Sequence, residues 1–416
     1  MSAADRSLRI ALLTYRGDPH SGGQGVYVRY LSRALRELGH RVEVVSAQPY
    51  PTLDEEMKLT RLPSLDLYRS EDPFRRPRRQ EFRDWVDVLE YGLMCSAAFP
   101  EPLTFSLRAA RMFRTRTSDF DLVHDNQCLG YGLLEVARRI PTVATVHHPI
   151  SLDRDADLHR AVTRRRRTTL KRWYGFTRMQ ARVARRLPRV VTVSDSARGD
   201  IIREFKVDPG KVGVVHNGVD ADLFRPLPDV RRVPGRVLTV ASADAPIKGL
   251  AFLIEAIAKL KTERDVELVV VGKGGVARGP RDLARRFGIV DAIRFEGAVD
   301  SLRLVELYAE AEVAVVPSLY EGFSLPAIEA MSCGVPLVTT TGGALPEVVG
   351  RNGEAGHLVP PGDAGALAAA IAALLDDEGR RESLGRAGRS RALNKFTWIQ
   401  TASDTVDLYR EAVATC

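Results

Sequence analysis

Short apolar runs alternate with stretches of helical periodicity along the whole chain. In the first half, apolar runs at 8–15 and 40–46 enclose a stretch in which Val28, Leu31 and Leu35 recur at helical spacing. A short continuous apolar run is typical of a strand buried in a parallel sheet, so this segment predicts a β-loop-α-β unit. Further strands are predicted at 121–124, 142–147 and 189–194.

The second half repeats the alternation. Strands are predicted at 236–241, 266–271, 293–295, 313–316 and 336–339, with helices between them at 250–260, 280–287, 302–311 and 326–331. Strands that alternate with helices predict a parallel sheet covered on both faces. The chain therefore predicts an α/β fold with two doubly wound, Rossmann-like parallel-sheet domains.

A proline-rich segment separates the two series. Residues 226–234 contain three prolines and are followed by Gly235, a composition typical of a linker. The predicted organisation is a first domain at 1–225, a linker at 226–235, a second domain at 236–395, and a C-terminal helix at 396–416 that packs back on the first domain. Ligands of such sheets bind beyond the carboxyl ends of the strands, where site residues are therefore expected.

Composition excludes several classes of protein. Among 416 residues, 44% are hydrophobic and 27% are charged, which excludes a mainly disordered chain. The four cysteines form no C-x-x-C pair, which excludes a cysteine zinc site and a redox dithiol. No apolar run reaches the ~18 residues of a membrane span, and no signal-peptide pattern stands at the start, so a cytoplasmic protein is expected. No Asp-x-Asp motif follows a strand, so no metal is expected.

A glycine-rich loop, HSGGQG, follows the first predicted strand. Glycines at this place let backbone N–H groups approach an anion at the helix N-terminus. An NAD site fits poorly, because the spacing is G-G-x-G and the second strand ends in Ser46, Ala47 and Gln48 with no acidic residue. A tight turn is the structural alternative. A loop that contacts a phosphate or an acceptor is favoured.

The most informative segment covers 313–340. A strand ends at Pro317, the next loop carries Glu321, and Ser324 can cap a helix that holds Glu329 one turn in. The loop amides and the helix N-terminus predict a cradle for a diphosphate. Glu329 is better placed to accept hydrogen bonds from a ribose diol, and Glu321 from the hydroxyls of a sugar. The alternative is that both glutamates are solvated surface charges.

The sequence EGFSLPAIEAMSCGVPLVTT resembles the signature of the family 4 retaining glycosyltransferases, whose Glu-x7-Glu pair is here Glu321 and Glu329. Four other segments are similar to the family in the family order: SGGQGVYVRYLSRALRELGHRVEVVS, VVHNGVDADLF at the domain junction, IKGLAFLIEAIAKL around the diphosphate lysine, and GHLVPPGD in the closing strands. The resemblance covers most of the chain. It implies the GT-B fold, in which two Rossmann-like domains face each other across a cleft.

The resemblance also implies a reaction. A hexose would move from a nucleotide diphosphate sugar to a hydroxyl of a lipid-linked or other glycan, with retained configuration and same-face attack. Neither a metal nor another cofactor is expected, because the nucleotide sugar is itself the co-substrate. The leaving phosphate would take the proton of the acceptor hydroxyl.

The family roles fall on particular residues of this chain. Three side chains, Lys248, Glu321 and Glu329, are implied to bind the diphosphate, position the sugar and hold the ribose, respectively. His147 matches the histidine that faces the transferred sugar, although the adjacent His148 blurs the match by one place. The remaining implied contacts to the donor come from Gly23 and from the backbone of Phe323, Ser324 and Leu325.

One position departs from the family pattern. Ser242 stands where the family has an arginine that also grips the diphosphate. A serine donates one neutral hydrogen bond, whereas a guanidinium offers a charged fork. Either another cation such as Lys273 compensates, or donor binding is weakened. The second reading leaves open a catalytically weak GT-B protein that binds nucleotide sugars or glycans as a partner.

The net charge of +8 comes from one region. Residues 151–190 hold thirteen Lys and Arg against three Asp, a surplus of ten. From Arg164 to Arg186 the pattern predicts an amphipathic basic helix whose apolar stripe includes Met179 and Val183. Three readings are open: a solvated helix face, contact with anionic lipid or an acidic acceptor, and nucleic-acid binding. No nucleic-acid motif accompanies the segment, so nucleic acid is not expected, and peripheral attachment to the inner membrane face is the hypothesis.

Overall fold

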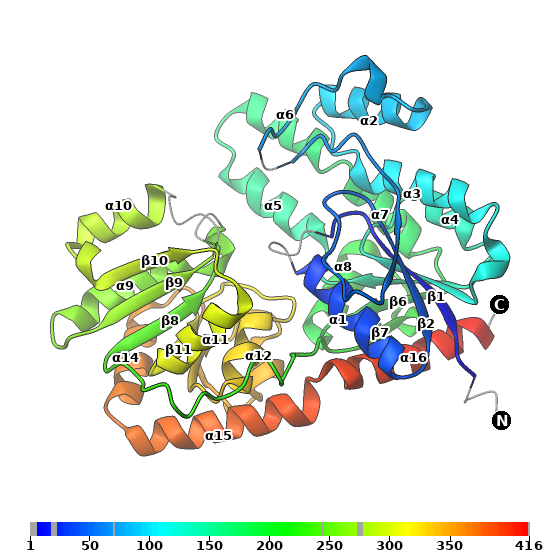
Figure 1. Ribbon diagram of the computed structural model, residues 1–416. Helices are drawn as coiled ribbons and strands as arrows, with labels where there is room; N and C mark the ends of the chain where they lie inside the picture. Colours follow the sequence, from blue (N-terminus) through cyan, green and yellow to red (C-terminus); the bar gives the residue numbers. More distant parts are fainter. Residues whose placement is uncertain (1–5, 18–22, 70, 243–244, 273–277, 415–416) are drawn as a thin grey trace. The chain divides into compact units, whose positions relative to one another are not determined.

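The computed structural model describes residues 6–17, 23–69, 71–242, 245–272 and 278–414. The chain forms two compact units, one of Met1–Val215 with Thr401–Cys416 and the other of His216–Gln400. Each unit is an α/β structure built on one parallel sheet (Figure 1). The prediction of two parallel-sheet α/β domains is confirmed.

The sheet of the first unit has seven parallel strands in the order β3-β2-β1-β4-β5-β6-β7. Five of them lie where the apolar runs predict strands, and two short ones, β3 and β7, were not predicted. The strand β3 has four residues and β7 has three, which is too short for a recognisable pattern of apolar and polar positions. The strand bounds are β1 Arg9–Thr14, β2 Arg41–Ser46, β3 Lys58–Arg61, β4 Leu122–Asn126, β5 Thr142–Val146, β6 Arg189–Thr192 and β7 Val212–Val214.

Several helices of the first unit bury an apolar face against the sheet. In α1, Val28, Leu31 and Leu35 are fully buried, and the chain turns after the helix at Gly39, whose φ of 86° suits glycine. Ser194 caps α8, because its hydroxyl accepts a hydrogen bond from the Ala197 amide. The helix bounds are α1 Gln24–Glu37, α2 Trp85–Cys95, α3 Glu101–Phe113, α4 Gly132–Val136, α5 Ile150–Arg160, α6 Arg164–Trp173, α7 Phe176–Ala184, α8 Asp195–Phe205 and α16 Trp398–Ala414.

The basic segment differs from its prediction. Two helices, α6 and α7, take the place of one, and they are separated at Tyr174 and Gly175. Met179 and Val183 are buried in the core of the unit, so the predicted apolar stripe faces the protein and not an outside surface. The exposed residues of the segment are mainly arginines, among them the four consecutive ones from Arg164. The amphipathic pattern is the one expected of a surface helix that packs its apolar side on the core of the protein.

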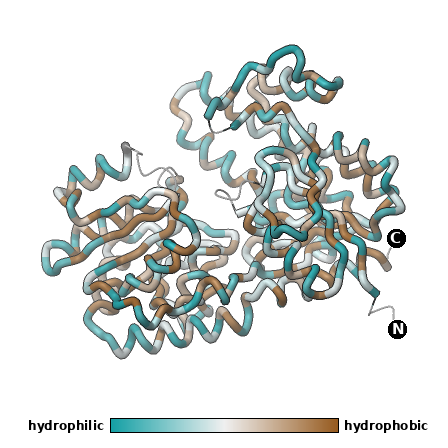
Figure 2. The backbone as a smooth tube through the Cα atoms, viewed as in Figure 1, coloured by the Kyte–Doolittle hydropathy of each residue, from teal (hydrophilic) through white to brown (hydrophobic). Residues whose placement is uncertain are grey.

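The sheet of the second unit has six parallel strands in the order β10-β9-β8-β11-β12-β13. Its strands are β8 Arg236–Val240, β9 Glu267–Val271, β10 Ile293–Gly297, β11 Val313–Val316, β12 Leu337–Thr340 and β13 His357–Val359. Its helices are α9 Leu250–Lys261, α10 Arg278–Phe287, α11 Ser301–Glu310, α12 Leu325–Ser332, α13 Leu345–Val349, α14 Ala364–Leu375 and α15 Glu378–Lys395. Leu253, Ile257, Leu268 and Val315 belong to one buried core between sheet and helices, and the strands stand out as hydrophobic chain in Figure 2.

The boundary between the units differs from the expected one. It lies at Val215 and His216, ahead of residue 225 and inside the segment identified as the domain junction. The proline-rich segment belongs to the second unit, where the Val233 amide donates to the Glu310 carbonyl (2.8 Å) and the Gly235 amide to the Glu312 carboxylate (2.7 Å). The C-terminal helix α16 joins the first unit from Thr401 on, and its Tyr409 hydroxyl lies 2.5 Å from Nδ1 of His124.

Candidate functional site

The first group of site residues lies at the carboxyl ends of β4 and β5. These strands are neighbours, so Asn126 and His147 meet at one edge of the sheet. Oδ1 of Asn126 lies 2.8 Å from Nε2 of His147, and Nδ2 of Asn126 donates to the Gln24 carbonyl (3.4 Å). Because the amide nitrogen is turned toward Gln24, Oδ1 faces the histidine and Nε2 must carry the proton. The lone pair of His147 is therefore on Nδ1.

The imidazole of His147 is neutral. Burial, with a smaller contribution from His148, lowers the pKa of His147 to about 3. The ring of Tyr27 stands edge-on to it, with 4.8 Å between the centroids. His148 points elsewhere, with Nε2 2.8 Å from the Asp153 carboxylate. The two adjacent histidines thus have different surroundings, and His147 is the one held among Asn126 and Tyr27 at the sheet edge.

Gln127 holds the backbone on either side of the His147–His148 pair in place. Its backbone turns away from the sheet at a φ of 57°. Its side-chain Oε1 accepts from the His147 amide (2.7 Å), and its Nε2 donates to the His148 carbonyl (3.1 Å). The side-chain amide thereby continues the β4–β5 pairing where the main chain has left it. Sequence reasoning missed Asn126 and Gln127, although polar residues that end a buried strand were the available signal.

The glycine-rich loop contains two adjacent glycines, of which the structure describes Gly23. Its φ of 73° is left-handed, and its carbonyl accepts the Tyr27 amide of the first turn of α1 (2.9 Å). An added Cβ would meet nothing within 4 Å, so the backbone conformation, and not space, favours glycine here. Residues 18–22 of the loop lie outside the described residues.

The second group of site residues lies at the carboxyl edge of the sheet in the second unit. Nζ of Lys248 donates to both carboxylate oxygens of Glu321, at 2.9 Å each, and the Ser318 hydroxyl donates to Oε1 (2.6 Å). Glu321 is 8% exposed, whereas Lys248 is only half-buried. The structure thus brings together the two residues that the sequence predicts for diphosphate and sugar. It adds Ser318, which the sequence did not indicate.

Two glycines permit this approach. Gly249, which follows Lys248, has a φ of 70°, and a Cβ there would lie 1.9 Å from the Pro317 carbonyl. At Gly343 a Cβ would lie 2.2 Å from the Glu321 carbonyl, which accepts the Ala344 amide (2.9 Å). The loops after β8, β11 and β12 therefore touch through their backbones, and a side chain at either glycine would push Lys248 and Glu321 apart.

The loop before α12 is strained at its cap. Ser324 has a φ of 122° and a ψ of 92°, which a side chain rarely adopts, and its hydroxyl accepts the Ala327 amide (3.4 Å). The buried ring of Phe323 packs against His216 and Phe396, with centroids at 5.9 and 5.5 Å. The ring thereby anchors the loop that leads into α12.

Glu329 is half-buried in α12, beside Tyr308. The tyrosine hydroxyl donates to Oε2 of Glu329 at 3.3 Å. Burial raises the pKa of Glu329 to about 7, and this hydrogen bond partly opposes the rise. The carboxyl therefore changes charge near neutral pH and, once ionised, accepts hydrogen bonds from hydroxyls. Tyr308 was not predicted from the sequence.

Ser242 follows β8, and its carbonyl accepts the Ala245 amide (3.2 Å). Lys273, the cation expected to compensate for the missing arginine, lies outside the described residues. In the described part of the chain, no group of three or more His, Cys, Asp or Glu side chains is arranged to hold a metal ion. Nor is any helix within those residues long and apolar enough to cross a membrane.

Comparisons with known proteins decide the family. A model described as "Glycosyltransferase Family 4" matches residues 21–223, and one described as "Glycosyl transferases group 1" matches residues 234–377. The chain is 50% identical to an MMP alpha-(1->4)-mannosyltransferase of Mycolicibacterium hassiacum, over 98% of this chain and 99% of the relative. The chain belongs to the family 4 glycosyltransferases. This family 4 protein is therefore an enzyme that transfers a glycosyl group.

Other members and solved structures agree. A D-inositol 3-phosphate glycosyltransferase 2 of Catenulispora acidiphila is 30% identical over 97% of this chain and 95% of its own. The sucrose-phosphate synthase structure of Thermosynechococcus elongatus matches with a TM-score of 0.75 at 24% identity, over 99% and 100% of the two chains. HepE of Anabaena in complex with UDP and glucose matches with a TM-score of 0.71 at 19% identity, over 96% and 99%. The fold of this family 4 glycosyltransferase is GT-B.

Proposed function

We propose that this glycosyltransferase is a retaining α-(1→4)-mannosyltransferase that moves a hexose, mannose, from a nucleotide diphosphate sugar to a hydroxyl of a glycan acceptor. The observation that carries the proposal is the 50% identity, over almost the full length, with a protein named as an alpha-(1->4)-mannosyltransferase. Nucleotide diphosphate mannose is α-linked, so an α-linked product implies retention. The complex of the structural relative HepE with UDP and glucose supports a nucleotide donor.

The edge with Lys248 suits the leaving group. In the ligand-free enzyme the lysine charge is paired with Glu321. A diphosphate that binds Nζ competes with this pair and releases carboxylate oxygens of Glu321 for the hydroxyls of the sugar, while Ser318 keeps the carboxylate in place. The lysine charge and the backbone amides before α12 then offset the charge that develops on the leaving diphosphate.

The edge with His147 suits the sugar and the acceptor. A neutral imidazole accepts a hydrogen bond from a sugar hydroxyl at Nδ1 without bringing a charge near the anomeric carbon. In the proposed same-face attack, the acceptor oxygen bonds to the anomeric carbon as the bond to the diphosphate breaks. The proton of the acceptor hydroxyl passes to the departing phosphate oxygen, so no protein group need take it. We propose that neither a metal nor another cofactor takes part.

A donor panel tests this function. The enzyme would be incubated with manno-oligosaccharide and with GDP-, UDP- or ADP-linked mannose, glucose or galactose, each with and without EDTA. The expected result is transfer from one mannosyl donor, unchanged by EDTA. Transfer only from a non-mannosyl donor would overturn the substrate, and loss of transfer with EDTA would overturn metal independence. Binding of a donor, seen as thermal stabilisation, without any transfer would favour a binding protein, for which the serine at position 242 is the supporting feature.

The exposed arginines of 164–186 favour an additional contact with an anionic membrane surface on the cytoplasmic side. Because Met179 and Val183 are buried in the core, such a contact would be electrostatic and would involve no insertion of α7. Sedimentation with vesicles that contain or lack anionic lipid, at low and high salt, tests it. Equal sedimentation with both kinds of vesicle would remove this proposal.

A further inference from the structure

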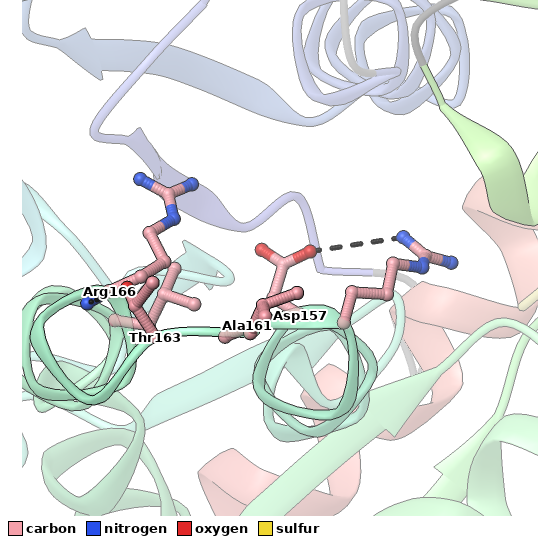
Figure 3. Close-up of a pocket in the computed structure, with 7 residues that line it drawn as sticks. Asp157, Ala161, Thr163 and Arg166 are labelled. Atoms are coloured by element: carbon pink, nitrogen blue, oxygen red, sulfur yellow. Dashed lines mark hydrogen bonds and ion pairs between the residues drawn. The ribbon is translucent and has the colours of Figure 1, made fainter.

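A hollow lies between the end of α5 and the start of α6, in the first unit (Figure 3). Its volume is about 430 Å³. Ala161 and the buried Leu170 give it apolar lining. The polar lining consists of Asp157, Arg160, Thr163 and Arg166. The hollow is part of neither group of site residues described above.

The shape of the hollow is held by contacts between the two helices. The Tyr174 hydroxyl, at the end of α6, donates to Oδ2 of Asp157 on α5 (2.8 Å). Nε of Arg167 donates to the Leu158 carbonyl (3.4 Å). The helix start is fixed as well, because the Thr163 hydroxyl accepts the Arg166 amide (3.2 Å). The hollow is therefore present before any ligand binds.

The lining combines groups that suit a neutral sugar. Sugar hydroxyls both donate and accept hydrogen bonds, and the lining offers a carboxylate acceptor beside guanidinium donors, with Oδ1 of Asp157 3.9 Å from Nη1 of Arg160. The apolar lining from Ala161 and Leu170 suits the C–H face of a pyranose ring. A phosphate would be attracted by Arg160 and Arg166 but repelled by Asp157, so the hollow favours an anion less than does the outward face of α6, where the exposed arginines have no such carboxylate among them.

The position of the hollow fits a long acceptor. Helix α5 begins at Ile150, three positions after His147, and runs for 11 residues to Arg160. At a rise of about 1.5 Å per residue, its far end lies roughly 16 Å along the helix from the sheet edge that carries His147. We propose that the hollow is a second glycan subsite, which binds a neutral sugar unit of the acceptor several units away from the reacting hydroxyl. This inference rests on the proposed transfer to a glycan.

Acceptor length provides the kinetic test. Arg166→Ala and Arg160→Ala are compared with Arg165→Ala, the matched control, since Arg165 is exposed on the same helix but does not line the hollow. For long neutral manno-oligosaccharides, we expect the first two variants to raise KM about tenfold with kcat unchanged. A mannose monosaccharide acceptor should show no difference, and Arg165→Ala should behave as wild type. An equal effect on short and long acceptors, or an effect of Arg165→Ala as large as that of Arg166→Ala, would overturn the subsite.

A binding measurement without donor separates the subsite from the reaction. Calorimetric titration of the full-length enzyme with the same oligosaccharides should give binding that strengthens with length and that Arg166→Ala weakens about tenfold. If this binding is found but no sugar is ever transferred, the proposed function fails and the subsite stands. If sugar is transferred but the binding does not depend on length, the subsite fails alone. The oligosaccharide titration would also be repeated with inorganic phosphate or anionic vesicles present. If either weakens oligosaccharide binding as strongly as added sugar does, the hollow is an anion site and the proposed subsite is wrong.

Discussion

The two sheet edges that carry the site residues are built alike and differ in chemistry. In each unit, loops at the carboxyl ends of neighbouring parallel strands bring the residues together. The edge of the first unit holds an imidazole and two side-chain amides, all uncharged. The edge of the second unit holds the ion pair of Lys248 and Glu321. The fold determines where a site can form, and the residue types at the strand ends determine whether it handles charge.

The partners explain the difference. His147 and Lys248 are both half-buried, but the polar side chain that contacts His147 is a neutral amide, and the lowered pKa of about 3 keeps the imidazole uncharged. Lys248 is half-exposed and keeps a charged partner that an incoming diphosphate can replace. A buried ion pair would have been costly to separate, whereas a partly exposed lysine can exchange one anion for another. The first edge thus suits hydroxyls, and the second suits the leaving diphosphate.

The largest expected effect concerns the charged edge. Lys248→Ala and Glu321→Ala should each lower kcat/KM at least about 100-fold, because they remove the cation of the leaving group or the carboxylate that positions the sugar. Circular dichroism should show that both variants remain folded. Lys259→Ala is the matched control, since Lys259 is exposed on α9 and pairs with Glu255. Near-normal turnover of either variant would mean that the substituted residue takes no part in the reaction.

A smaller loss is expected at the neutral edge. Gln127→Ala should lower kcat about tenfold with little change in the KM of the donor, because the His147 amide and the His148 carbonyl lose their hydrogen bonds to the Gln127 side chain. Gln180→Ala removes a buried amide that bonds the Gln127 and Cys128 carbonyls and not the backbone of His147 and His148. This control should be destabilised to a similar extent, by about 1 kcal/mol, but lose less activity. Equal activity losses would mean that Gln127 acts only through stability.

Much of this comparison could be predicted from the sequence. The apolar runs predict most strands, and the strand, loop and helix pattern of 313–340 places Glu321 beyond a strand end. The role of Lys248 came from the resemblance to the family, and its ion pair with Glu321 was not predicted. Polar residues at strand ends could be named from the sequence, but which of them meet across distant parts of the chain could not be predicted. Asn126 and Gln127 reach His147 only because β4 lies beside β5, and Tyr308 reaches Glu329 from another helix. The prediction for the basic segment was wrong for a related reason. An apolar stripe has the same spacing in the sequence whether it faces a membrane or the core of the protein.

The ionisation of Glu329 gives the second unit a pH dependence of donor binding that the first unit should lack. With a raised pKa of about 7, Glu329 is mostly protonated at pH 6 and mostly ionised at pH 8. In the role that we propose for Glu329, the ribose hydroxyls of the donor would donate to the ionised carboxylate, so the Kd of the donor should fall up to about tenfold as the pH rises from 6 to 8. In Glu329→Gln the Kd should be nearly independent of pH over this range. Tighter binding by the wild type at pH 6 than at pH 8 would contradict the assigned role.

The smallest effect concerns stability at the neutral edge. The pKa of His147 is lowered in the folded state, so the unfolded state binds its proton first as the pH falls below about 6.5. Stability from the neutral histidine is therefore present above that pH and is lost as the pH falls toward 3. From pH 7.5 to about 5.8, urea denaturation should show wild type losing about 1 kcal/mol more than His147→Asn. An equal loss in both proteins would mean that His147 is not kept neutral.

The stereochemistry of the product tests the central proposal most directly. The enzyme would be given nucleotide diphosphate mannose and a manno-oligosaccharide, and the new linkage would be followed by proton NMR at the anomeric position from the first turnovers. The proposed function predicts an α-(1→4) mannosyl linkage from the start, formed by the wild type and not by Lys248→Ala. A β-linked first product, or an α linkage to a hydroxyl other than the one at position 4, would contradict it.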